Sequence, residues 1–135
     1  MEGSGLMILI VLVAMLFCHI IDDYKLQGIL ASMKQKSWWE SNAPDRLYRN
    51  DYLMALVEHA FSWTCSIHIP VLVYSICTQQ HQPVYVYVVV FILNWVIHAL
   101  IDNLKANAHE INLIQDQFIH IIQIVITWAV YLLLG

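Results

Sequence analysis

Four long apolar stretches constrain the fold of this chain more than any other feature. They cover roughly residues 6–24, 52–77, 84–104 and 113–134, and each is long enough to cross a bilayer as a helix. The composition agrees, because 60% of the residues are hydrophobic and 12% are charged, about half the charged fraction of an ordinary soluble domain. The sequence therefore predicts an all-α integral membrane protein, with one domain built as a four-helix bundle, and argues against a soluble globule or a nucleic-acid-binding protein.

The basic residues all lie on one side of this predicted topology. Five of the six fall between the first and second spans, and Lys105 falls between the third and fourth. Because cytoplasmic loops of membrane proteins are enriched in Lys and Arg, both of these connections are expected in the cytoplasm. Both termini and the 78–83 turn are then expected on the non-cytoplasmic side.

Residues 28–50 form the one sizeable polar loop. Apolar residues at helical spacing near its start, together with Trp38 and Trp39, indicate an interfacial helix at headgroup depth in its first half. Membrane lipid is accordingly an expected partner. A homodimer is a second one, because four short helices leave a wide apolar perimeter.

Ionisable residues recur at one spacing inside the apolar stretches. Three His–Asp pairs are each four residues apart, which places both members on one helix face, whereas chance gives fewer than one such pair from seven His and six Asp. The pairs are His19 with Asp23, His98 with Asp102, and Asp116 with His120.

The predicted topology brings these pairs, and His59, to the cytoplasmic ends of all four spans. Imidazole and carboxylate ligands without Cys suit zinc first, with manganese or Fe(II) as alternatives. The predicted metal ligands are His19, Asp23, His59, His98, Asp102, Asp116 and His120. The competing interpretation is structural, because His–Asp pairs can also hold a membrane bundle together.

Taken in order, these motifs resemble those of the domain-of-unknown-function family 3307, small polytopic membrane proteins of bacteria and phages. The matching motifs are His19-x3-Asp23-x3-Gln27, then His59, then His98-x3-Asp102-x2-Lys105, then Asp116-Gln117-x2-His120. The resemblance implies a shared polar site that includes Gln27, Lys105 and Gln117. It also implies the inner membrane of a bacterium or of a phage-infected host, but it implies no activity.

A metal-dependent hydrolase acting on a membrane-adjacent substrate is the leading functional hypothesis. A bound divalent ion would activate water, with Glu58 or an Asp as general base and Lys105 holding an anionic headgroup or developing charge. Gln27 and Gln117 would orient the ligands. Two alternatives stay open: a metal or proton transport component, and a structural or regulatory protein whose His–Asp pairs only lock the bundle.

Overall fold

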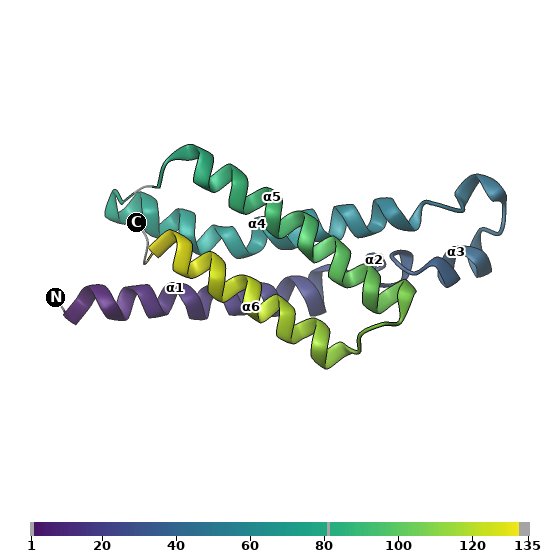
Figure 1. Cartoon of the computed structure of the whole chain (residues 1–135), viewed down its shortest axis with the longest axis horizontal. Coiled ribbons are helices and arrows are strands. Elements are labelled where there is room, and N and C mark those ends of the chain that lie inside the picture. The colour runs from purple at the N-terminus through teal and green to yellow at the C-terminus, as the bar shows by residue number, and fades with distance from the viewer. Residues whose placement is uncertain (1, 81, 133–135) are drawn as a thin grey trace.

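The computed structural model describes residues 2–80 and 82–132, and within them the regular elements are all helical. Four long helices form the body of the molecule (Figure 1). These are α1 (Glu2–Ile21), α4 (Tyr52–Thr78), α5 (Val84–Asn103) and α6 (Leu113–Leu132). All four, with short flanking turns, are long and apolar enough to cross a membrane.

Short helices lie between the long ones. Two π-helices, η1 (Asp22–Leu26) and η3 (Leu104–Ala108), extend α1 and α5. Between η1 and α4 lie α2 (Leu30–Met33), α3 (Lys36–Asn42) and the 3-10 helix η2 (Arg46–Tyr48).

The observed helix ends lie close to the predicted ranges. The helices α4, α5 and α6 begin at residues 52, 84 and 113, as the hydropathy pattern predicts, and α1 starts earlier, at Glu2. Residues 133–134 of the predicted fourth span, and residue 81 of the predicted turn, lie outside the described residues.

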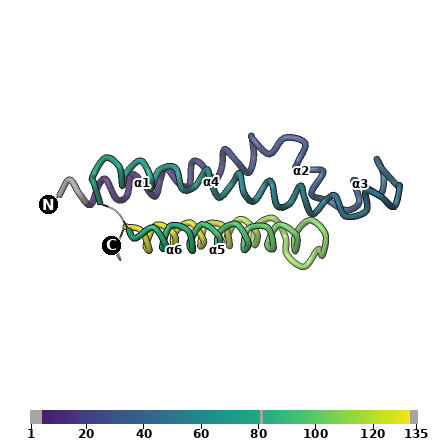
Figure 2. Tube along the Cα trace, turned by 90° about the horizontal axis from the view of Figure 1, so that it is seen from above, coloured from purple at the N-terminus to yellow at the C-terminus, as the bar shows by residue number. Residues whose placement is uncertain are grey.

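The four long helices pack as a ring. Helix α4 packs against α1 and α5, and α6 packs against the same two neighbours. Seen from above, α1 and α4 make one layer and α5 and α6 the other (Figure 2). The first turn of α1 and the last described turn of α6 lie at one end of the bundle. The turn η3 and the α2–α3 segment lie at the opposite end (Figure 1).

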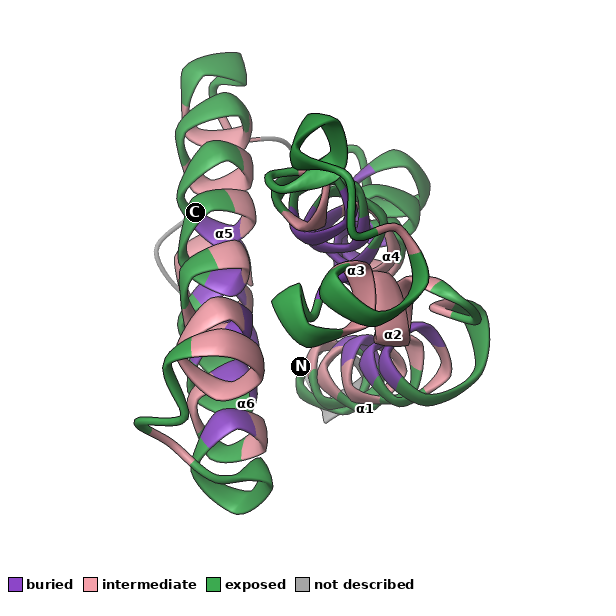
Figure 3. Ribbon diagram, turned by 90° about the vertical axis from the view of Figure 1, so that its right-hand side faces the viewer, coloured by how far each residue is buried: buried purple, intermediate pink, exposed green. Residues whose placement is uncertain are grey.

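The bundle is apolar on its outside and polar along much of its inside. Large apolar side chains such as Val13, Phe17 and Leu93 are more than half exposed, while the buried positions turn toward the space between the two layers (Figure 3). Apolar packing around Met15 and Trp63 fills the part of the interior nearer the chain ends. The other part contains buried His and Asp side chains.

The 28–50 segment contains two short α-helices, and part of it folds against the bundle. Helix α2 packs on α4, and α3 contains Trp38 and Trp39. The interfacial location of its first half stays a prediction. The Trp39 indole N–H donates to the Met33 carbonyl at 2.6 Å. Asn107 donates to the Lys34 carbonyl at 3.0 Å and accepts from the Lys36 backbone N–H at 2.7 Å. Lys34 is thereby buried, with 5% of its surface exposed.

Candidate metal centre

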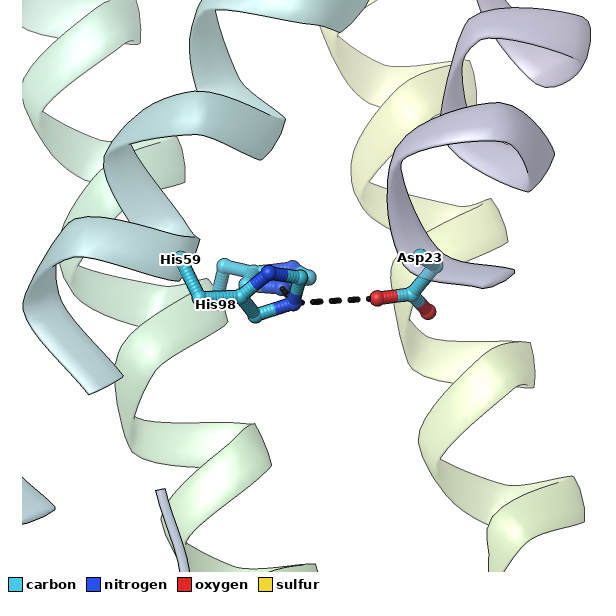
Figure 4. Close-up of side chains that lie close together, drawn as sticks. All are labelled: Asp23, His59 and His98. Atoms are coloured by element: carbon cyan, nitrogen blue, oxygen red, sulfur yellow. Dashed lines mark hydrogen bonds and ion pairs between the residues drawn. The ribbon is translucent and has the colours of Figure 1, made fainter. Parts of the chain in front are cut away.

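His59, on α4, lies at the centre of the first group of candidate ligands. Its Nε2 atom is 3.1 Å from Asp23 Oδ1 of η1 and 3.3 Å from His98 Nε2 of α5. Figure 4 shows the Asp23 carboxylate pointing at the two imidazole rings from the facing helix. Asp102 Oδ2 lies 3.4 Å from the same His59 atom. Four side chains from three elements therefore converge on one point.

His120, on α6, defines a second group next to the first. Its Nε2 atom is 3.4 Å from Asp116 Oδ1 and 3.5 Å from Asp102 Oδ1. Among the described residues these three atoms are buried without a hydrogen-bond partner. The His120 and His98 rings stack with their centroids 4.0 Å apart, so the two groups are contiguous. Asp102 gives one oxygen to each group.

The spacing of these atoms fits a divalent metal. Ligand atoms held at about 2.0–2.1 Å from a tetrahedral zinc ion lie about 3.3 Å from each other. The distances around His59 and His120 are 3.1–3.5 Å. Among the described residues, three overlapping sets place their ligand atoms within 4.8 Å of one another: Asp23, His59 and His98; His98, Asp102 and His120; and Asp23, Asp116 and His120.

The charge of the cluster also fits a divalent cation. The cluster region contains four buried carboxylates and two ammonium groups: those of Asp22, Asp23, Asp102 and Asp116, and those of Lys34 and Lys105. Lys34 Nζ lies 2.5 Å from Asp102 Oδ2, and Lys105 Nζ lies 2.5 Å from Asp116 Oδ2. With neutral imidazoles, two negative charges remain uncompensated, and uncompensated buried charge is costly. One divalent ion makes the cluster neutral.

His19, one of the predicted metal ligands, lies at the cluster, but its hydrogen bonds do not suit a ligand. The Trp63 indole N–H donates to His19 Nδ1 at 2.8 Å, and because indole nitrogen is only a donor, this nitrogen carries the lone pair. His19 Nε2–H then donates to Gln117 Oε1 at 3.1 Å. Both ring nitrogens of His19 are therefore engaged in hydrogen bonds. His19 contributes to the cluster by orienting Gln117.

Gln117 lies between the two ligand groups. Its amide donates to Asp23 Oδ2 at 2.7 Å and to Asp116 Oδ2 at 3.0 Å. It therefore connects one carboxylate from each of the two ligand groups and holds both toward the cluster.

Two other predicted site residues, Glu58 and Gln27, do not point at the ligand atoms of the cluster. Glu58 is exposed on α4 and lines a separate hollow with Met33 and Trp39, so the role of general base does not fit it. Its neighbour His59 faces inward, and adjacent residues on a helix diverge by about 100°. Gln27 donates to the Asp23 backbone carbonyl, so it supports η1 and not the ligand atoms.

Three contributors to the cluster were not predicted as site residues. Lys34 contacts Asp102 from the segment predicted as a polar cytoplasmic loop. Gln123 Oε1 accepts from His120 Nδ1 at 3.0 Å, and Trp63 stacks on His98 with ring centroids 4.1 Å apart. Gln123 lies three residues after His120, so helical spacing could have identified it. No local pattern marks the other two.

Asp22 lies on the other side of the His59 ring. Its Oδ2 atom accepts from Ser62 at 2.9 Å and from Ser66 at 2.6 Å, while Oδ1 lies 4.0 Å from His59 Nδ1. That separation is too long for a hydrogen bond, so His59 Nδ1 is buried without a partner among the described residues.

A π-helical turn lies at or close to the end of each HxxxD motif. Asp22 and Asp23 lie in η1, and Asp102 lies two residues before η3. The Gln27 N–H bonds to the Asp22 carbonyl at 3.1 Å, five residues back. A widened turn of this kind redirects side chains and is frequent at functional sites.

Comparison with family models, curated proteins and solved structures gives no match to this chain. The function is therefore inferred from the cluster itself.

Proposed function

We propose that this protein is a multi-pass membrane protein that binds one divalent metal ion, zinc in the first place, inside its helical bundle. The observation that carries the proposal is the convergence of six buried His and Asp side chains at 3.1–3.5 Å spacing around His59 and His120. The proposed ligands are drawn from Asp23, His59, His98, Asp102, Asp116 and His120.

The membrane location is supported by four helices of sufficient length and by their apolar outward faces. Every Lys and Arg belongs to the end of the bundle that contains the cluster, so the positive-inside rule favours a cytoplasmic centre. The family 3307 resemblance favours the inner membrane of a bacterium or a phage-infected host.

Hydrolysis of a membrane-adjacent substrate is the activity we propose for this centre. A bound divalent ion supplies Lewis acidity and an activated water. The proton acceptor has to come from the cluster carboxylates, because Glu58 is directed away. Lys105 lies at the edge of the cluster, with 23% of its side chain exposed, where it can hold an anionic group.

Transport of protons or metal is a second candidate, and one observation favours it. Polar side chains continue from His120 into the bundle, through Gln123 to Asn94 and from Asn94 to Thr127 at 2.7 Å. Near the other end the Ser75 and Tyr87 hydroxyls are 2.9 Å apart. Metal uptake by proteoliposomes separates transport from a centre that is open on one side only.

Elemental analysis of the detergent-purified protein tests the metal centre. Purified without chelators, the wild type is expected to carry near-stoichiometric metal, and His98→Ala and Asp102→Ala are expected to lose it. His109→Ala is the matched control, because His109 is exposed and outside the cluster. Equal metal content in wild type and His98→Ala, or no metal in folded wild type after zinc, manganese or iron is supplied, would refute the proposal.

A further inference from the structure

A hollow of about 330 Å³ lies next to the cluster on its loop side. It is lined by Gln27, Lys34, Gln35, Lys105 and His109, together with two alanines. The two lysines are the ones that pair with the cluster carboxylates Asp102 and Asp116. Their ammonium-bearing side chains therefore separate the hollow from the proposed ligands.

The charge of its lining distinguishes this hollow from its neighbours. Its lining contains two lysines and no acidic residue. A second hollow, around Arg46 and Arg49, also includes Glu40 and Asp45, and a third is lined by Asp51 and Glu58 without any basic residue. Of these three hollows, only the one beside the cluster presents positive charge unmixed with negative charge.

A metal ion in the cluster would make the lysines available to an outside anion. While the carboxylates of Asp102 and Asp116 carry their full charge, each holds an ammonium group at 2.5 Å. Once those carboxylates share their charge with a divalent cation, the attraction on Lys34 and Lys105 weakens, and both can interact with a ligand in the hollow.

We infer that this hollow binds the phosphate group of the substrate, and that it does so only when the cluster holds its metal. Two converging ammonium groups match a doubly charged phosphate better than a singly charged carboxylate. The polar but uncharged side chains of Gln27 and Gln35 line the same wall. The volume is near the lower limit for small-molecule sites, which suits a headgroup and not its acyl chains. This inference rests on the proposed metal centre.

Phosphorus NMR of the manganese-loaded protein tests the inference. Manganese is paramagnetic, so a phosphate bound beside the centre relaxes faster than one in bulk solution. The probes are inorganic phosphate and, separately, phosphatidic acid in detergent micelles, with phosphatidylcholine as the reference. Enhancement for inorganic phosphate supports a free phosphate ligand, and enhancement for phosphatidic acid alone supports a lipid headgroup. No enhancement for either overturns the inference.

The variant Lys105→Met tests phosphate binding in the hollow separately from metal binding in the cluster. It removes a cation from the cluster, so bound manganese is expected to remain while phosphate affinity falls by about tenfold or more. Lys25→Met is the matched control, because Lys25 is exposed on η1 and does not line the hollow. Unchanged phosphate relaxation in Lys105→Met would overturn the anion site while leaving the metal centre intact. Folded wild type that binds neither manganese nor zinc nor iron would refute both.

Discussion

The side chain behind His120 determines which of its nitrogens faces the cluster. Gln123 Oε1 accepts from His120 Nδ1–H, and the Gln123 amide is directed by Asn94, whose own amide donates to Thr127 Oγ1. With the proton held on Nδ1, the Nε2 lone pair faces Asp102 and Asp116. A metal ligand needs this tautomer.

Replacement of Gln123 tests this arrangement. In Gln123→Leu we expect metal to bind about 10–100-fold more weakly, because outer hydrogen-bond partners of metal-binding histidines have effects of that size. Competition with a chromophoric chelator measures the affinity. Gln115→Leu, an exposed glutamine on the same helix, is expected to leave the affinity unchanged. Equal affinities in both variants would show that Gln123 does not orient the ligand.

The two HxxxD motifs show how far sequence predicts the role of a residue. Four-residue spacing marks both His19 and His98, and His98 Nε2 lies 3.9 Å from Asp102 Oδ2 as that spacing predicts for a regular helix. Their roles differ because of Trp63, which donates a hydrogen bond to His19 but stacks on His98. Trp63 is more than thirty residues from either histidine. The spacing within a motif therefore cannot separate a ligand from a supporting residue.

At the level of elements, hydrogen bonds of the Asn107 side chain hold the α2–α3 segment against η3. Its side chain bonds the Lys34 carbonyl, the Lys36 N–H and Asn103 Oδ1 at 2.7–3.0 Å. These contacts hold Lys34 against Asp102. The hydropathy pattern predicts the four long helices because each is apolar over most of its length. It could not predict this closure, because the segment is polar and its fold depends on contacts about 70 residues away.

Loss of the Asn107 hydrogen bonds is expected to expose the metal centre to solvent. Asn107→Ala removes hydrogen bonds worth about 0.5–1.5 kcal/mol each, so we expect a chelator to strip the metal about tenfold faster. Stopped-flow measurement of metal release gives the rate. Asn42→Ala removes one exposed hydrogen bond to the Trp38 carbonyl and serves as the control. The same release rate in both variants would mean that the segment does not cover the centre.

At the scale of the whole molecule, the asymmetric distribution of basic residues predicts one orientation in the membrane. A single cysteine at Ser41, in a variant without the native cysteines, is expected to react with an impermeant maleimide only after the cytoplasmic face is opened. A cysteine at Gln80, at the other end of the bundle, is expected to react in intact spheroplasts. Both native positions are exposed. The reverse labelling pattern would contradict a cytoplasmic centre.

The unequal polarity of the four spans has a consequence for biosynthesis. The strongly apolar α1 and α5 are each followed in the chain by a less apolar partner, α4 and α6. A strongly apolar span can enter lipid unaided, whereas Asp116 and His120 make α6 costly to insert before its neighbours are present. Because α6 is the last of the four to be synthesised, the centre cannot assemble until the other three spans are in place. Metal capture would then report that these four spans have been integrated.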